Sequence, residues 1–227
     1  MRKMFLTIVT LLPLFSMAQF GIKAGVNFAS VTNASDINAS NESGFLVGVF
    51  LAPPSNGIMG FRTELIYSRQ GYNYKTNTNT GTVNLDYILL PQLMQINITK
   101  FVSLQAGFQM AFLINAKADS TPTSSSIPGN PYGAAYSSMM DYYNKFDYGV
   151  AAGIEVHPFK GLLVGARYNL SLGNLYKDPS SYETSGGQPP SFIPQVDAKN
   201  NVIQLFVGWI FGNNSSKKKE KQTQPQQ

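Results

Sequence analysis

Apolar and polar residues alternate through eight segments of this chain, and the connectors between these segments are alternately short and long. The segment 20–28 shows the pattern, with Phe, Ile, Ala, Val and Phe at even positions and Gly, Lys, Gly and Asn at odd positions. A period of two over about ten residues is typical of a strand with one apolar and one polar face, long enough to cross a tilted bilayer. The alternation therefore predicts a protein that spans a membrane with strands.

The predicted strands cover residues 20–29, 44–52, 58–70, 83–98, 101–115, 146–157, 162–174 and 201–211. The connectors after the second, fourth and sixth strands are brief, and the other connectors are longer and rich in Ser, Thr, Asn, Gly and Pro. Outer-membrane barrels have short periplasmic turns and longer external loops. We therefore predict an all-β fold, an eight-stranded antiparallel up-and-down transmembrane β-barrel over residues 19–212.

The composition favours a wall that faces lipid. Charged residues make up 13% of the chain, about half of the ~25% that is typical of soluble domains. The chain has no cysteine, which excludes disulfides, thiolate metal sites and a cysteine nucleophile. The formal charge of +5 comes from the two ends of the chain, so no basic face of the kind that binds nucleic acid is expected.

The two ends of the chain have compositions of their own. Residues 1–18 resemble a secretory signal peptide, with Arg2 and Lys3 before an apolar stretch and a small-x-small cleavage site that ends at Ala18. We expect cleavage after Ala18, export and insertion into the outer membrane of a Gram-negative cell envelope. Residues 213–227 are rich in Lys and Gln, and we expect them to form a disordered periplasmic tail.

Parity assigns each strand residue to the lipid or to the lumen. The lipid-facing set is Phe45, Val47, Val49, Leu51, Phe61, Leu65, Ile88, Leu90, Met94, Ile96, Val102, Leu104, Phe108, Phe112, Tyr148, Val150, Ile154, Leu162, Val164, Tyr168, Leu170, Ile203, Leu205, Val207, Trp209 and Phe211. Aromatic girdles at the two water boundaries are predicted to include Tyr67, Tyr87, Tyr148 and Trp209. The opposite face is rich in Gly, Asn and Gln, which suits a lumen only about wide enough for its own side chains.

Six ionisable residues point toward the lumen by the same parity: Lys23, Arg62, Glu64, Asp147, Glu155 and Arg167. Three are basic and three acidic, so their charges cancel. Buried charges are strongly unfavourable unless they are paired and hydrogen-bonded. We therefore predict a packed, charge-balanced lumen. The alternative is a narrow polar path that makes the protein a small-solute pore.

Several motifs resemble the PorT-like outer-membrane β-barrel family. The segment 19–27 resembles its first strand, and 85–93 resembles its Tyr-Leu-Glu-Ile-Pro-Leu-Leu strand, with Leu89 where an acidic residue is usual. The segments 146–149 and 166–169 resemble its Asp-Tyr-Gly and Arg-Tyr signatures, and 201–211 its closing strand. The resemblance implies an outer-membrane barrel, and some relatives are accessory components of a type IX-like secretion apparatus.

The residues predict no catalytic site, metal site or cofactor. A serine esterase needs Ser, His and an acid together, and the sole histidine, His157, is predicted to lie at a short periplasmic turn. The acidic residues of the loops do not have the spacing of a calcium-binding loop. A lipid-modifying envelope enzyme and a soluble ligand-binding barrel are therefore the less favoured alternatives.

Two long loops, 116–141 and 175–200, are the candidate interaction sites. Tyrosine beside Ser, Gly and Asn suits adaptable recognition, and the candidate residues are Tyr132, Tyr136, Tyr142, Tyr143, Tyr182 and Phe192. We predict a structural or interaction protein whose partners are outer-membrane lipid and, through its extracellular loops, other envelope proteins. No nucleic-acid partner is expected, and the sequence does not specify an oligomeric state.

Overall fold

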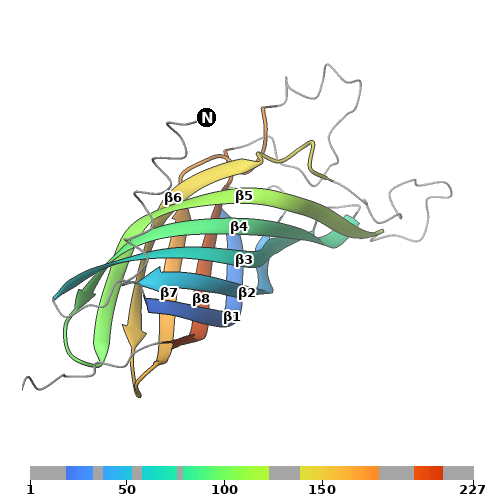
Figure 1. Cartoon of the computed structure of the whole chain (residues 1–227). Coiled ribbons are helices and arrows are strands. Elements are labelled where there is room, and N and C mark those ends of the chain that lie inside the picture. The colour runs from blue at the N-terminus through green and yellow to red at the C-terminus, as the bar shows by residue number, and fades with distance from the viewer. Residues whose placement is uncertain are drawn as a thin grey trace, which may run out of the picture.

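The computed structural model describes residues 19–32, 38–52, 58–75, 79–122, 139–178 and 197–211, except for the side chains of residues 79 and 119–122. Its strands are β1 (Gln19–Thr32), β2 (Ser40–Ala52), β3 (Met59–Lys75), β4 (Asn79–Asn97), β5 (Val102–Pro122), β6 (Phe146–Val156), β7 (Leu162–Ser171) and β8 (Lys199–Ile210). Each strand pairs antiparallel with the next, and β8 pairs with β1 to close a ring (Figure 1). The predicted eight-stranded up-and-down barrel is confirmed.

No helix long and apolar enough to cross a membrane is found in the described part of the chain. The predicted signal peptide at 1–18 and the predicted tail at 213–227 lie outside the described residues.

Register explains how long polar side chains fit inside so narrow a ring. Lys23 on β1 lies opposite Gly48 on β2 and Gly208 on β8. Arg167 on β7 lies opposite Gly153 on β6. Because glycine has no side chain, each pairing leaves room beside a long cation that points toward the lumen. The alternation of Gly with Lys or Arg on facing strands is thus a packing requirement of the interior.

The outer wall is apolar, as parity predicts. Val26, for example, lies opposite Phe45 and Leu205, and all three side chains are exposed on the wall. The wall positions of β6 run from Phe146 to Val156. At about 3.3 Å per residue and a tilt of about 40°, ten residues give an apolar band roughly 25 Å tall. This height matches the hydrocarbon layer that a membrane barrel must cover.

One predicted girdle residue is placed wrongly. Tyr67, Tyr148 and Trp209 lie on the wall, but Tyr87 is buried inside the barrel. The physical reason is the period of two itself: Ile88 faces outward, so its neighbour Tyr87 must face inward. The bulge between β4 and β5 lies at Asp86 and Tyr87 and does not turn the Tyr87 ring outward.

The strands differ in length, and β1 to β5 are all longer than predicted. β3 ends at Lys75 rather than residue 70, β4 begins at Asn79 rather than 83, and β5 ends at Pro122 rather than 115. The third connector is therefore short and not long. Figure 1 shows β3, β4 and β5 running past the other strands to the right, at the end of the barrel where the long connectors lie. We call residues 72–75, 79–85 and 115–122 the sheet extension.

The interior has two layers. A charged layer lies in the half nearer the short turns, and its central residues are Lys23, Arg62, Glu64, Glu155 and Arg167. Most of a buried apolar cluster fills the half nearer the long connectors, and this part includes Tyr72, Tyr74, Val83, Leu85, Tyr87, Leu113, Met139, Tyr143, Leu175 and Tyr176. Phe50, Leu163, Phe206 and Ile210 of the same cluster lie in the other half, with the charged layer. The described residues thus place ionic contacts toward one end of the barrel and an aromatic core toward the other.

Candidate functional site in the barrel lumen

Glu64 on β3 is the centre of the charged layer. Its carboxylate accepts a hydrogen bond from Lys23 Nζ at 2.6 Å and two from Arg167, at 2.7 Å from Nη1 and 3.0 Å from Nη2. All three side chains are 0% exposed. Three strands, β1, β3 and β7, are therefore joined through one carboxylate that water does not reach.

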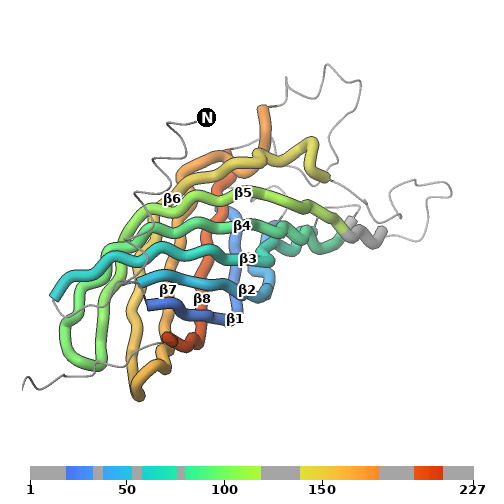
Figure 2. Tube along the Cα trace, in the orientation of Figure 1, coloured from blue at the N-terminus to red at the C-terminus, as the bar shows by residue number. Residues whose placement is uncertain are grey.

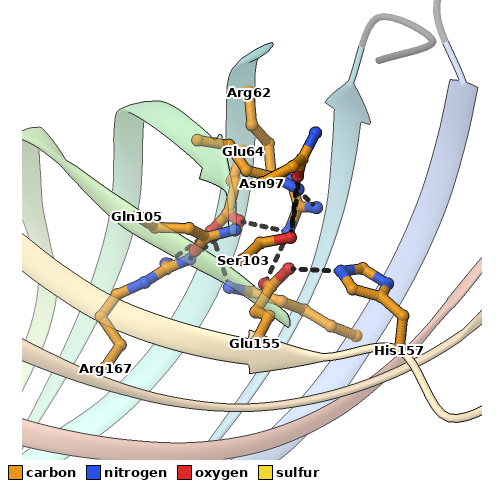
Figure 3. Close-up of polar contacts among 10 residues, drawn as sticks. Arg62, Glu64, Asn97, Ser103, Gln105, Glu155, His157 and Arg167 are labelled. Carbon is orange, nitrogen blue, oxygen red and sulfur yellow. Dashed lines mark hydrogen bonds and ion pairs between the residues drawn. The ribbon is translucent and has the colours of Figure 1, made fainter. Parts of the chain in front are cut away.

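A second pair lies nearer the short turns (Figure 3). Arg62 Nη1 donates to Glu155 Oε1 at 2.6 Å, and Arg62 Nη2 donates to Gln95 Oε1 at 3.0 Å. The Gln95 amide in turn donates to Asn97 and to the hydroxyl of Ser103. This polar network continues the charged layer across β3, β4, β5 and β6.

Two aromatic rings complete the charged layer, and the sequence analysis did not single them out. The Phe206 ring centroid lies 4.2 Å from Lys23 Nζ and 5.2 Å from Arg167 Cζ. The Phe50 ring centroid lies 4.6 Å from Arg62 Cζ. A cation over an aromatic face is stabilised by the ring quadrupole. Parity could have found both residues, because Phe45 and Leu205 on the same strands face outward.

Asp147 does not join these contacts, although it was predicted to do so. Its carboxylate accepts hydrogen bonds from Ser171 Oγ at 2.6 Å and from the backbone N–H groups of Tyr148 and Gly173. Asp147 is near the start of β6, eight residues from Glu155, so about 26 Å of strand separates it from the ions that it was expected to neutralise. Within the described residues, the charged layer holds three cations and two carboxylates.

The mouth at the long-connector end is closed by tyrosines. The hydroxyl of Tyr176 donates to that of Tyr72 at 2.9 Å, and the hydroxyls of Tyr72 and Tyr143 are hydrogen-bonded at 2.7 Å. Tyr143 and Tyr176 also form a β-bridge between the two long connectors. Burial raises the pKa of the Tyr143 and Tyr176 hydroxyls, so both remain protonated and able to donate. We call Tyr72, Tyr143 and Tyr176 the tyrosine latch.

Backbone bonds hold the latch in place. The Leu113 N–H donates to the Lys145 carbonyl at 2.8 Å, and the Met139 N–H donates to the Ala116 carbonyl at 2.9 Å. The Leu175 N–H donates to the Ala198 carbonyl at 2.8 Å. The segments before β6 and after β7 are therefore fixed to β5 and to the start of β8 across the barrel mouth.

The candidate loop residues divide into two groups. Tyr143 is buried in the latch, and Tyr142 beside it is half-buried. Tyr132, Tyr136, Tyr182 and Phe192 lie outside the described residues. Among the residues described, no group of three or more His, Cys, Asp or Glu side chains could hold a metal ion.

An ion pair on the outer wall lies at the edge of the apolar band nearer the long connectors, and the sequence analysis missed it. Arg69 Nε donates to Asp86 Oδ1 at 2.8 Å, and Asn115 Nδ2 donates to Asp86 Oδ2 at 2.8 Å. Arg69 follows Tyr67 by two positions on the outward face of β3, so the charges begin directly above the aromatic boundary. Tyr67 and Arg69 are two positions apart and so share one face of the strand, and this spacing could have predicted a charged residue on the outer wall next to the aromatic boundary.

His157 lies at the opposite end, where its Nε2 is 3.7 Å from Glu155 Oε2 (Figure 3). Burial lowers the pKa of His157 below its ordinary value, and the nearby Glu155 carboxylate opposes this effect. A histidine with a lowered pKa in the folded state binds protons more readily when unfolded. The contribution of His157 to the free energy of unfolding should therefore be fully present above about pH 6.5. It should be lost as the pH falls through the pKa of His157 in the folded protein.

We expect His157→Gln to reduce this acid-dependent loss. Urea unfolding of both proteins in detergent micelles, compared between pH 7.5 and pH 5, measures it. An equal loss in the two proteins would show that other groups cause the pH dependence.

Comparison with known proteins gives a family and a set of similar folds. Residues 10–177 match the family described as outer membrane protein beta-barrel domain. No match is found among curated proteins.

Three solved structures illustrate the similar folds. The attachment invasion locus protein Ail of Yersinia pestis is 16% identical, with a TM-score of 0.46 over 86% of this chain and 99% of Ail. Neisserial surface protein A is 15% identical, with a TM-score of 0.47 over 84% of this chain and 96% of that one. OprG from Pseudomonas aeruginosa is 12% identical, with a TM-score of 0.42 over 86% of this chain and 96% of OprG.

Proposed function

Because the chain belongs to the outer membrane protein beta-barrel domain family, we propose that this outer-membrane barrel has a sealed lumen and acts as an interaction protein through its long-connector end. In this orientation the short turns face the periplasm and the sheet extension faces the outside of the cell. The membrane wall anchors the protein, and the parts outside the membrane recognise an envelope partner.

The observation that carries this proposal is the packing of the lumen. Side chains of Lys23, Glu64, Arg62, Glu155 and Arg167 are each at most 1% exposed. A water-filled path through the barrel would leave such charged side chains accessible to solvent. The tyrosine latch closes the same lumen a second time, nearer the mouth. Both layers favour a closed barrel over a small-solute pore.

The sheet extension supports the interaction role. Lys75, Thr80 and Lys117 are exposed on its outer face, while Tyr72 and Val83 on its inner face are buried in the apolar cluster. A sheet that is packed on one face and polar on the other is a rigid platform, and rigid platforms present recognition residues at low entropic cost.

Photocrosslinking in intact cells tests the proposal. A photoreactive residue placed at Thr80 or at Lys117 should give the same crosslinked protein, and one placed at Lys160 on a short turn should not. Purified protein in planar bilayers should carry almost no current. A steady single-channel conductance, or crosslinks at Lys160 alone, would contradict the proposal.

The resemblance to the PorT-like family makes a secretion accessory the alternative form of this function. The two forms differ in the partner that they require. Mass spectrometry of the crosslinked product separates them, because an accessory of a secretion apparatus would be crosslinked to another component of that apparatus.

A further inference from the structure

The short turns expose more apolar surface than a water-facing turn should. Ile58 is 73% exposed and Phe159 is 71% exposed, whereas Trp209 on the adjoining wall is 45% exposed. Phe101 and Ile98, in the turn between β4 and β5, are also among the most exposed apolar residues. Contiguous exposed apolar surface on a soluble face is rare and marks contact with a partner or a membrane.

Two of these turns each contain a phenylalanine next to a lysine. Lys100 precedes Phe101 in one turn, and Lys160 follows Phe159 in the other. Figure 2 shows both turns, green and orange, at the lower left end of the barrel. They flank the β5–β6 pair, and the His157 N–H donates to the Phe101 carbonyl at 2.7 Å. Two Phe–Lys pairs are therefore held side by side at one end.

The turns are also rigid. The Thr99 hydroxyl accepts hydrogen bonds from the N–H groups of Phe101 and Val102 at 3.1 and 3.0 Å. Gly161 has a φ of 90°, and a Cβ there would lie 3.1 Å from the Trp209 ring. L side chains rarely adopt this φ, so the backbone favours glycine here, and the nearby ring leaves little room for a Cβ. The exposure of Phe101 and Phe159 is thus a fixed property of these turns.

The exposed charge at this end has one sign. Among the described residues of the short-turn end, the charged side chains on the surface are Lys100 and Lys160, because Arg62 and Glu155 are buried. Neither lysine has an ion-pair partner in the described part of the chain. Residues 53–57, which form the remaining short connector, contain no charged residue.

We propose that the short-turn end binds anionic phospholipid, with Phe101 and Phe159 inserted among the upper acyl carbons and Lys100 and Lys160 on the headgroup phosphates. The exposed apolar residues of the turns continue the apolar wall, which lipid already covers. The same lipid layer can therefore cover the turns, and no separate protein partner is needed to bury them. Aromatic rings and lysines are the residues that settle at the boundary between hydrocarbon and headgroups. The turns then lie within the headgroup region of their leaflet rather than in water.

The charge part of the proposal is tested by native mass spectrometry of the full chain with added phosphatidylglycerol or phosphatidylcholine. Wild-type protein should retain more phosphatidylglycerol. Lys100→Gln/Lys160→Gln should weaken this preference by roughly fivefold for each lysine. The matched control is Lys117→Gln/Lys145→Gln, which removes two exposed lysines from the opposite end and should keep the preference. An unchanged preference in the first variant, or an equal loss in the control, overturns the proposal.

The insertion part is tested with a tryptophan placed at the turn. Trp209 is the only tryptophan, so Trp209→Phe combined with Phe159→Trp leaves a single tryptophan, at the turn, which is excited selectively at a wavelength where tyrosine does not absorb. In nanodiscs, lipids brominated high on the acyl chain should quench it, and aqueous iodide should not. Quenching by iodide without quenching by the brominated lipid overturns the proposal. Both variants replace exposed turn residues, and Trp209→Phe keeps an aromatic ring on the wall. Unheated electrophoresis verifies that both variants fold.

Discussion

Glu64→Gln should lower the free energy of unfolding by about 3–5 kcal/mol, because it leaves two buried cations without their carboxylate. Lys23 and Arg167 both donate to Glu64, and no part of any of the three side chains reaches solvent. A neutral amide keeps the size of the side chain but removes the charge. Urea titration in lipid vesicles, with folded and unfolded protein separated by unheated electrophoresis, measures the loss.

Two further variants show whether uncompensated charge is the cause. Adding Lys23→Met to Glu64→Gln removes one of the orphaned cations and should recover part of the lost stability. Glu42→Gln changes the same chemical group near the barrel mouth, where Glu42 accepts a hydrogen bond from Asn73, and should cost at most about 1 kcal/mol. A loss below about 1 kcal/mol for Glu64→Gln itself would show that the charged layer is not sealed.

Tyr143→Ala should open the barrel mouth. Tyr143 is fully buried between Tyr72 and Tyr176, and its ring centroid lies 5.3 Å from that of Tyr176. Removing a buried aromatic ring costs about 3–5 kcal/mol. Here the lost packing destabilises the connectors that cross the mouth. The amide hydrogens of Leu113 and Leu175, which bond to these connectors, should exchange at least a hundredfold faster. Hydrogen exchange followed by mass spectrometry measures this.

The matched variant is Tyr143→Phe, which keeps the ring and removes one hydroxyl. It should cost about 1 kcal/mol, the usual value of one hydrogen bond, and change exchange by only a few fold. Amides in the paired core of β1 and β8 should keep their protection in both variants. Equal acceleration by the two substitutions would mean that the hydroxyl, and not the packing of the ring, holds the mouth closed.

Much of this architecture follows from parity alone. A single period of two places Lys23, Arg62, Glu64, Glu155 and Arg167 inside the barrel, and it does so without knowledge of register. Local sequence could not give the pairings, because they depend on how far each strand is shifted relative to its neighbour. Glu64 meets Arg167, for example, across 103 positions of sequence.

The strand ends were harder to predict for a different reason. Tyr72, Tyr74, Val83 and Leu85 alternate with polar residues, but Asn, Thr and Gly between them are also typical of loops. These residues become strands because their inner face packs on the segments around Tyr143 and Tyr176, which come much later in the chain. Tertiary packing thus extends β3, β4 and β5 beyond the point at which local propensity would end them.

Closure of the ring through β1 and β8 has a consequence for biogenesis. Gly21 pairs with Ile210, so the seam joins residues from opposite ends of the chain. Loop-closure entropy makes contacts of such long sequence separation the slowest to form. Until the seam closes, the hydrogen-bonding groups on one edge of β1 and one edge of β8 have no partner, which is prohibitive in hydrocarbon. The closed barrel can therefore form only once β8 (Lys199–Ile210) is present to pair with β1, and until then both edges need protection from hydrocarbon.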